Sequence, residues 1–324
     1  MTLSRHWPSG VGLALGYLAD RVIGDPRRGH PVAGFGLAAS WLEPRCYSDR
    51  RAAGMVHTGA LVAAATALGV ALERLNANRP AASVMTTAVS TWAVLGGRSL
   101  SSEAATVAAQ LADGRLIAAR NQVRHLVGRD TAELTPEEVA RATVESLAEN
   151  TSDAVVAPLF WGVVAGLPGL LGYRAANTLD AMIGHRSPRY LRFGWAAARL
   201  DDVANWLPAR LAALATAAWA PLVGGNARNA IGVVRRDAGR HPSPNAGIVE
   251  AAFAGALDVR LGGRNAYQGT VEDRGVLGDG RPVAVTDIDR ASRLAAAVSM
   301  SALIAAVLVR SIGLRPEGSA RRRP

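Results

Sequence analysis

The sequence predicts an all-α, multi-pass integral membrane protein with about five transmembrane helices, whose polar loop and helix regions form a site. Hydrophobic residues make up 49% of the chain and charged residues 19%, and five long runs contain no Asp, Glu or Arg. A soluble domain usually carries about 25% charged residues. No internal repeat divides the chain, so we expect a single membrane domain over residues 1–324.

The expected membrane spans follow from the apolar runs, since about 20 mostly apolar residues cross a bilayer. Flanking arginines, such as Arg293 and Arg310, can reach the interface and extend a short run. The segment Gly10–Ile23 contains Asp20 and Arg21, which favours an interfacial or buried helix. A soluble protein with very apolar core helices is the alternative, but five such runs are hard to bury in a chain of this length. The runs lie near 52–72, 80–97, 154–173, 211–227 and 294–309.

The distribution of arginine leaves the topology open. Residues 25–51 and 98–153 are rich in arginine, which favours the cytoplasmic side. Five simple crossings would put residues 174–210 and the Arg321–Arg323 tail on the other side, against the same rule. A re-entrant segment is one solution. The run Ala154–Tyr173 holds two prolines, and irregular backbone is tolerated where protein encloses it.

The basic residues exclude several chemistries. All 36 are arginine and the net charge is +10, so a lysine Schiff base and a Walker A lysine are both impossible. Phosphates or carboxylates must therefore be held by arginine, backbone N–H groups or a metal. Cys46 is the single cysteine and the six histidines lack zinc spacing, which excludes multi-thiolate and zinc sites. The net charge alone gives no support to nucleic-acid binding.

Three local signals place helix ends and a loop. Thr135–Glu138 is a capping box with proline at the first helical position, and its helix should reach about Asn150. Asp287 and Asp289 are expected to cap the last apolar helix. The Gly-rich, polar stretch from Gly262 to Val285 predicts a long loop.

A first acidic group borders the third apolar run. Glu145 and Glu149 lie four residues apart on one helix face, where like charges repel, and Asp153 follows. Magnesium is held by one or two carboxylates plus substrate phosphates, so a hard cation would explain these acids. A solvated helix face is the alternative, and we prefer it for Glu138.

Further polar groups follow along the chain. Asp201 and Asp202 can ligate a metal, although an ion pair between Arg199 and Asp202 is the alternative. Between Arg235 and Glu250 the chain carries polar residues and two prolines that force an extended entry into the next helix. The remaining candidate polar residues are Asn177, Asp180, Asn205, Arg210, Arg236, His241 and Asn245.

In this order the motifs resemble the CobD/CbiB family of adenosylcobinamide-phosphate synthases. The resemblance covers Gly16 to about Gly280, with His185, Ala154 and Ile248-Val249 as small departures. Its carriers are DRVIGDPRRGHPV, VESLAENTSDAVVAPLFW, NTLDAMIGHR, RFGWAAARLDDVANWLPARL and RRDAGRHPSPNAGIVEAAFAGALDVRLGG.

The resemblance implies a multi-pass enzyme of the cell membrane that acts late in cobalamin biosynthesis. The implied reaction is an amide-forming ligation of aminopropanol, or its O-phosphate, to a propionate carboxyl of adenosylcobyric acid. ATP and magnesium are implied, with no bound prosthetic group and no nucleic acid. Other late corrinoid-pathway enzymes are expected partners.

We assign roles on this basis. Catalytic candidates are Glu149, Asp180, Asp202, His241 and Glu250, the last two as the base that deprotonates the amine. Metal candidates are Glu145, Glu149, Asp153, Asp201 and Asp202. Candidates for binding substrate or phosphate are Asn177, Arg199, Asn205, Arg210, Arg236 and Asn245.

Two other functions compete with this interpretation. A CDP-alcohol phosphotransferase also uses membrane-embedded aspartates, but the order Ala198-Arg199-Leu200-Asp201-Asp202 fits its motif poorly. A transporter of a corrinoid or small metabolite would line its path with charges, yet no two-fold hydropathic repeat is visible.

Overall fold

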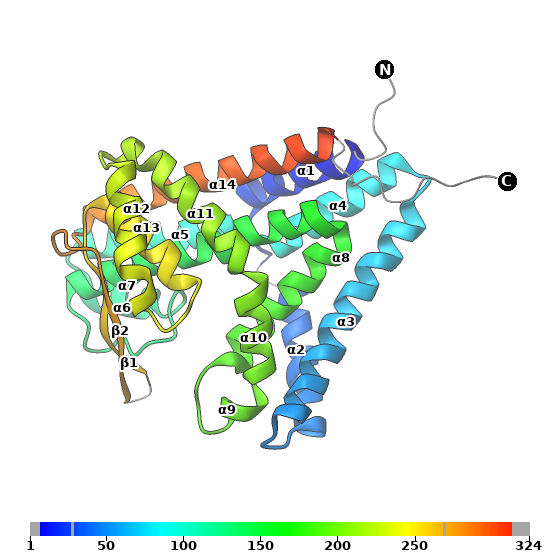
Figure 1. Cartoon of the computed structure of the whole chain (residues 1–324), viewed down its shortest axis with the longest axis horizontal. Coiled ribbons are helices and arrows are strands. Elements are labelled where there is room, and N and C mark those ends of the chain that lie inside the picture. The colour runs from blue at the N-terminus through cyan, green and yellow to red at the C-terminus, as the bar shows by residue number, and fades with distance from the viewer. Residues whose placement is uncertain (1–6, 27–28, 268–269, 313–324) are drawn as a thin grey trace.

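The computed structural model describes residues 7–26, 29–267 and 270–312. These are almost entirely helical, which confirms the predicted all-α class (Figure 1). The Arg321–Arg323 tail lies outside the described residues. The helices are α1 (Trp7–Ile23), α2 (Pro31–Cys46), α3 (Arg51–Asn76), α4 (Pro80–Val94), α5 (Gly97–Ala112), α6 (Leu116–Val123), α7 (Pro136–Thr151), η1 (Ser152–Val156), α8 (Ala157–Leu179), η2 (Asp180–Gly184), α9 (Tyr190–Phe193), α10 (Trp195–Ala204), α11 (Trp206–Trp219), η3 (Ala220–Val223), α12 (Ala227–Asp237), η4 (Ala238–Arg240), α13 (Ala246–Leu257) and α14 (Thr286–Ile312).

Four stretches of helix in the described part of the chain are long and apolar enough to span a membrane. They are Arg51–Asn76, Pro136–Gly184, Trp206–Val223 and Thr286–Ser311, and each contains one of the predicted runs or most of it. The fifth expected span, near 80–97, forms α4. With 15 residues it is shorter than the bilayer requires, because Pro80 begins it and Gly96-Gly97 follow it.

The stretch Pro136–Gly184 is not one straight helix, because its direction reverses at Gly166. This residue has φ 66° and ψ −147°, a conformation open only to glycine. Beyond the break, a Cβ built on Gly169 would lie 2.4 Å from the carbonyl oxygen of Trp161, so the two halves of α8 touch. Figure 1 shows the two halves as a helical hairpin. This supports the re-entrant interpretation of the third apolar run.

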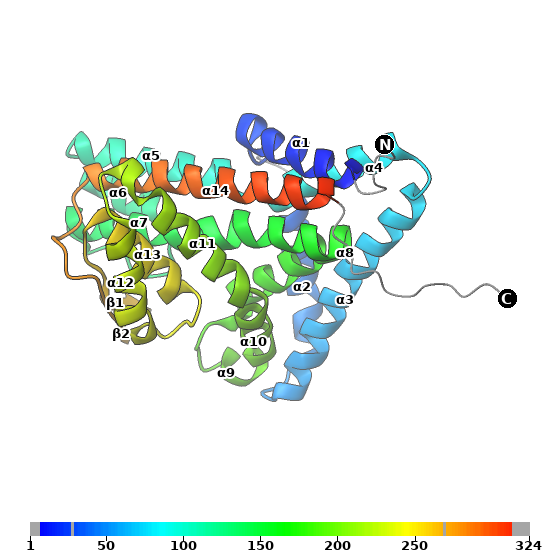
Figure 2. The same ribbon diagram turned by 45° about the horizontal axis from the view of Figure 1, so that its top comes forward.

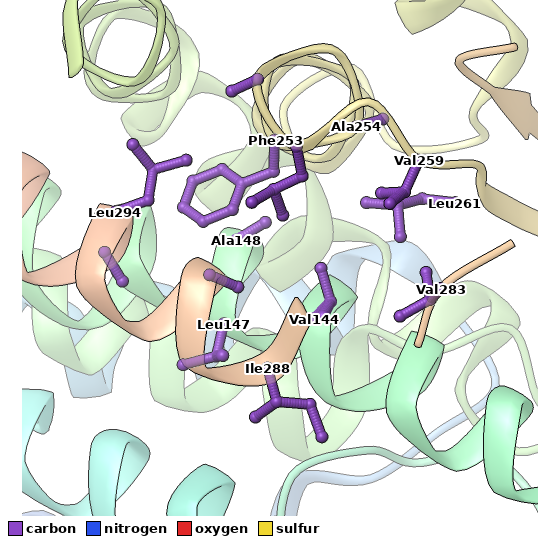
Figure 3. Packing of buried hydrophobic residues seen from close by; sticks show 14 of the residues in the cluster. Val144, Leu147, Ala148, Phe253, Ala254, Val259, Leu261, Val283, Ile288 and Leu294 are labelled. Atoms are coloured by element: carbon purple, nitrogen blue, oxygen red, sulfur yellow. The ribbon is translucent and has the colours of Figure 1, made fainter. Parts of the chain in front are cut away.

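The largest core joins α7, α13 and α14. Leu147, Phe253 and Leu294 are fully buried against one another's helices (Figure 3). From this core α14 continues beside α1 and α8 (Figure 2). The core fixes α7 and α13 relative to each other, and both carry predicted site residues.

The prediction of a loop from Gly262 to Val285 is wrong in part. Strands β1 (Leu261–Tyr267) and β2 (Thr270–Leu277) form an antiparallel hairpin there, with an irregularity between Gly262 and Arg264. Gly262, Gly263 and Gly278, which contributed to the loop prediction, adopt positive φ at the bulge and the ends of this hairpin. Leu261 and Leu277 are buried in the core, which supplies the stabilisation that the local sequence lacks.

The helix-end predictions are largely confirmed. Thr135 and Glu138 form the capping box that begins α7. Asp287 accepts from the backbone N–H of Ala284 at 2.8 Å and pairs with Arg281 and Arg290, so its role at the start of α14 is structural. The Gly10–Ile23 segment lies within α1, which packs against α4.

Candidate functional site

Five carboxylates gather into what we call the acidic cluster, namely Glu149, Asp153, Asp180, Asp201 and Asp202. They come from α7, η1, η2 and α10. Asp153 interacts electrostatically with Asp201, Glu149 and Asp180, and Asp180 also interacts with Asp202. The α8 hairpin makes this possible, because its return brings η2 back to η1. All five were predicted site residues.

The acidic cluster is held by neutral hydrogen-bond donors. The Tyr173 hydroxyl lies 3.0 Å from the backbone oxygen of Asp153 and 2.9 Å from Oδ1 of Asn205, so it bridges the hairpin to α10. Nδ2 of Asn177 donates to Oδ1 of Asp201 at 3.2 Å. Both ends of the hairpin are π-helical turns, a feature frequent at functional sites. Predicted Asn177 and Asn205 therefore belong to this cluster.

One edge of the acidic cluster is lined by arginine. Arg199 pairs with Asp202 at 3.0 Å, so the alternative ion-pair interpretation is confirmed for these two residues. Nδ2 of Asn245 donates to the backbone oxygen of Asp202 at 2.8 Å, and Arg210 donates to Oδ1 of Asn245 at 3.5 Å. These contacts connect the entry to α13 with α10 and α11.

Burial changes the acidity of the carboxyls on α10. It raises the pKa of Asp201 to about 6, although hydrogen bonds from Asn177 and Asn205 oppose the shift. Burial also raises the pKa of Asp202, with the nearby Arg199 lowering it. Asp201 is therefore a stronger base than an ordinary aspartate and is still mostly ionised at neutral pH.

The N-terminal segment supplies polar residues that were not among the predicted site residues. Asp25, whose Gly-Asp-Pro context is typical of a turn, accepts from Ser99 Oγ at 2.5 Å and lies 3.3 Å from Nε2 of His30. It also interacts electrostatically with Arg174, which in turn interacts with Asp153. The sequence does contain a signal for Arg174 as a site residue, because its spacing places it on the same helix face as Asn177. Arg27 and Arg28, in the same motif as Asp25, lie outside the described residues.

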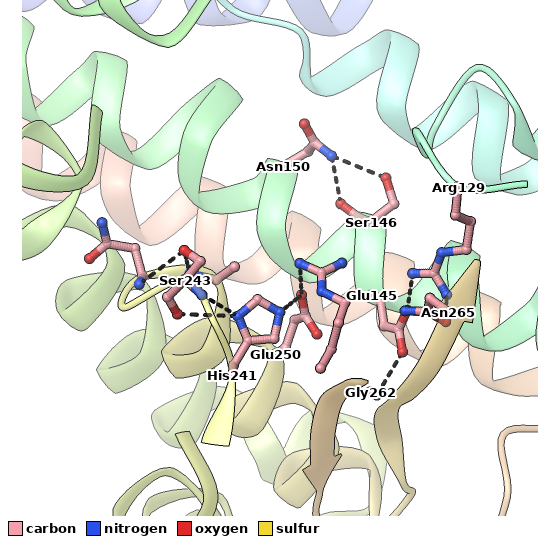
Figure 4. Close-up of polar contacts among 12 residues, drawn as sticks. Arg129, Glu145, Ser146, Asn150, His241, Ser243, Glu250, Gly262 and Asn265 are labelled. Atoms are coloured by element: carbon pink, nitrogen blue, oxygen red, sulfur yellow. Dashed lines mark hydrogen bonds and ion pairs between the residues drawn. The ribbon is translucent and has the colours of Figure 1, made fainter. Parts of the chain in front are cut away.

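Glu145 does not join the acidic cluster. It forms a buried ion pair with Arg129, with side-chain exposures of 3% and 2%. Its Oε1 accepts from the backbone N–H of Gly262 at 2.7 Å, and Arg129 also donates to Oδ1 of Asn265 at 2.8 Å (Figure 4). Both oxygens of Glu145 are thus engaged in fastening the β-hairpin to α7, which argues against its predicted role as a metal ligand.

His241 and Glu250 form a second buried pair. Nε2 of His241 lies 3.7 Å from Oε1 of Glu250, and both side chains are at most 1% exposed (Figure 4). Nδ1 of His241 lies 3.0 Å from the backbone nitrogen of Ser243 and 3.2 Å from its backbone oxygen, so this turn holds the ring in place. Burial lowers the pKa of His241 to about 4 and raises the pKa of Glu250 well above its ordinary value. His241 is therefore neutral at pH 7, and the shift of Glu250 favours its protonated form.

Arg236, predicted to bind phosphate, joins neither group. It pairs with Asp237 at 2.9 Å and with Asp279 at 3.0 Å. Asp237 also accepts from the backbone N–H of Gly278 at 3.0 Å. The arginine therefore fastens the end of β2 to α12, and its guanidinium is neutralised locally.

The donor atoms of the acidic cluster suit magnesium, but they do not complete a site. Among the residues that the structure describes, no group of three or more His, Cys, Asp or Glu side chains is arranged to hold a metal ion. Magnesium commonly takes one or two carboxylates and completes its shell with water and phosphate. The residues present fit a metal that arrives with a phosphate-bearing ligand.

A family model described as CobD/Cbib protein matches residues 13–295, a range that includes the acidic cluster and both buried pairs. The chain belongs to the CobD/CbiB family. It is 54% identical over 301 residues to the cobalamin biosynthesis protein CobD of Mycobacterium tuberculosis (strain ATCC 25618 / H37Rv), with 92% of this chain and 95% of that protein covered. This confirms the resemblance inferred from the motifs.

More distant members of the family match over similar lengths. The CobD protein of Rhizobium meliloti (strain 1021) is 46% identical over 86% of this chain and 90% of its own length. That of Pelobacter propionicus is 40% identical over 84% of this chain and 86% of its own length. No solved structure matches the chain.

Proposed function

We propose that this protein takes part in cobalamin biosynthesis at the cell membrane. It joins aminopropanol, or its O-phosphate, to a propionate carboxyl of adenosylcobyric acid through an amide bond. Membership of the CobD/CbiB family supports the pathway. The observation that carries the chemistry is the acidic cluster, because it concentrates five carboxylates beside arginines without forming a complete metal site.

The proposed reaction needs an activated carboxyl, because a carboxylate does not accept an amine at neutral pH. ATP transfers its terminal phosphoryl group to the propionate oxygen, which gives an acyl phosphate and ADP. The amine nitrogen then forms the bond to the acyl carbon, and phosphate leaves as the C–O bond breaks. Catalysis of this kind depends on positioning and on stabilising developing charge.

The residues of the acidic cluster suit the first step. Two of its carboxylates, Asp180 and Asp202, would hold magnesium, which supplies charge neutralisation on the phosphates when it is bound. Arg199 and Arg210 at the edge of the cluster would grip phosphate or a corrin carboxylate with their planar donors. Asn177 and Tyr173 keep the carboxylates in place.

The proton of the incoming ammonium needs a base, and Asp201 suits this role better than His241 or Glu250. Its pKa of about 6 makes it a comparatively strong base that remains ionised at pH 7. Burial lowers the pKa of His241 to about 4, which makes it a weak base, and it raises the pKa of Glu250, which favours the protonated carboxyl. We therefore move the proposed base from His241 and Glu250 to Asp201.

The test is product formation by membranes that contain the protein. Adenosylcobyric acid, magnesium-ATP and either aminopropanol or its O-phosphate are supplied, and the corrinoid is analysed by mass spectrometry. We expect a mass gain equal to the amine minus water, with ADP release that requires both substrates. Asp202→Asn should abolish it, whereas the exposed Asp113→Asn serves as the matched control.

The same experiment separates the enzyme from a transporter. A transporter would move labelled corrinoid into vesicles without changing its mass or consuming ATP in proportion to an amide. An unchanged corrinoid mass, with folded protein present in the membrane, would overturn the proposed function.

A further inference from the structure

A polar cavity of about 80 Å³ lies between α7, the loop after α6 and strand β2. One water molecule occupies ~30 Å³, so a cavity of this volume has room for a small polar group such as a phosphate. Polar and charged side chains dominate its wall. The lining residues that matter here are Gly128, Arg129, Glu145, Ser146, Glu149 and Arg274.

Two guanidinium groups bring positive charge to the cavity wall. Glu145 in its wall is neutralised by Arg129 and lies 3.9 Å from Nε of Arg141. Arg274 lies 3.9 Å from Glu250, and burial raises the pKa of that carboxyl, which favours its neutral form. Of the side chains that line the cavity, Arg129 and Arg274 are cationic, and Arg129 also pairs with Glu145.

The cavity also adjoins the acidic cluster. Glu149 lines the cavity and interacts electrostatically with Asp153, Asp180 and Asp201. A group bound in the cavity therefore lies one side chain away from the proposed metal-binding carboxylates. The β-hairpin that carries Arg274 forms the opposite wall.

We propose that this cavity binds a phosphate group of a substrate, with Arg274 on the β-hairpin and Arg129 at the cavity wall as its guanidinium ligands. Arginine suits the role because its planar fork matches phosphate oxygens. The molecule that carries this phosphate is a phosphorylated amino alcohol or a nucleotide. Only the choice of this carrier rests on the proposed function.

The first test uses the unmodified full-length protein in detergent. Arginine side chains are modified with phenylglyoxal and mapped by peptide mass spectrometry, with and without inorganic phosphate, aminopropanol O-phosphate, aminopropanol or magnesium-ATP. We expect inorganic phosphate to protect Arg274 several-fold, while the exposed Arg264 on the neighbouring strand stays reactive. The carrier is whichever of the other phosphate-bearing probes protects at the lower concentration, and unphosphorylated aminopropanol should not protect.

The second test compares affinities by calorimetry. Arg274→Gln should weaken binding of the protecting probe about tenfold or more, the effect of one charge-assisted hydrogen bond. Arg274→Lys should recover part of the affinity, because it restores the charge but not the fork. Arg264→Gln on β1 is the matched control and should bind like the unmodified protein.

The outcomes separate this proposal from the proposed function. If no phosphate-bearing probe protects Arg274, or if Arg264→Gln loses as much affinity as Arg274→Gln, the cavity is not a phosphate site, even where membranes still form the amide. Protection of Arg274 without any amide product would leave the phosphate site standing and remove the proposed reaction.

Discussion

The hydroxyl of Tyr173 donates to the backbone oxygen of Asp153 at 3.0 Å, although twenty residues separate them. In a continuous helix these residues would lie about 30 Å apart, at 1.5 Å per residue. The contact exists because α8 turns back at Gly166. The hydroxyl therefore connects the two ends of the hairpin that carry Asp153 and Asp180.

Tyr173→Phe should destabilise the protein by about 1–3 kcal/mol. The substitution removes the one hydroxyl proton that the buried oxygens of Asp153 and Asn205 share, and an unsatisfied buried group costs about this much. Thermal unfolding in detergent measures the change. Tyr47→Phe is the matched control, because its hydroxyl donates to the backbone oxygen of Arg189 at an exposed position. An equal shift in both variants would contradict the prediction.

Gly166→Ala should destabilise the protein by at least about 1–3 kcal/mol, the cost of a conformation that L-residues avoid. The added Cβ would also lie 2.1 Å from Oε1 of Glu73, which accepts from the backbone N–H of Leu167 at the turn. Gly59→Ala in α3 is the control: a Cβ there meets nothing within 4 Å, and alanine favours a helix. The unfolding midpoint should fall for the first variant and stay or rise for the second.

Asp201→Asn should remove activity and also change how stability depends on pH. Burial raises the pKa of Asp201 from 3.8 to about 6, so the folded state binds a proton more tightly than the unfolded state. The ionised carboxylate therefore destabilises the folded state. This destabilisation develops as the pH rises from 3.8 to about 6 and persists at higher pH. The variant should be more stable than the native protein at pH 8, by about 1–3 kcal/mol, and similar at pH 3.5.

The activity of the native protein should fall below about pH 6, because the proposed base is then protonated. Amide formation measured from pH 5 to pH 8 checks this limb. If any residual activity of Asp201→Asn still falls below about pH 6, the titrating group is a residue other than Asp201.

Arg129→Gln and Glu145→Gln should each destabilise the protein by about 3–5 kcal/mol, because each leaves a buried charge without its partner. The double variant should lose less than the sum of the two. Unfolding of all three in detergent measures the coupling, and the exposed pair Arg115 and Asp113 is the control, with about 0–1 kcal/mol expected. Retained activity per folded molecule in Glu145→Gln would establish a structural role for Glu145.

Hydropathy predicted most of the fold because the membrane imposes a length on each apolar segment. The runs near 52–72, 211–227 and 294–309 became candidate spans, whereas 80–97 formed a shorter helix between Pro80 and Gly96. The local sequence pattern did not predict the β-hairpin. Its strands are stabilised by Leu261 and Leu277 in the core and by Glu145 on another helix, and a sequence window does not contain these partners.

The same distinction applies to the site. Helical spacing placed Glu145 and Glu149 on one face and so suggested one role for both. The structure separates them, because Arg129 reaches Glu145 from a loop sixteen residues earlier in the chain. Polar residue types identified Asp180 and Asp201 correctly as neighbours, since carboxylates beside membrane-spanning runs are costly and therefore gather where they serve a function. Arg236 pairs with the distant Asp279 as well as with its neighbour Asp237, and a sequence window does not contain the first of these partners.

The turn at Gly166 has a consequence for sidedness. A segment that enters and returns leaves the polypeptide before Pro136 and after Gly184 in the same aqueous compartment. The arginine-rich stretches on either side of it then share one face of the bilayer, as the charge bias of membrane proteins requires. Under the proposed function, nucleotide, amine and corrinoid would then all approach from one compartment.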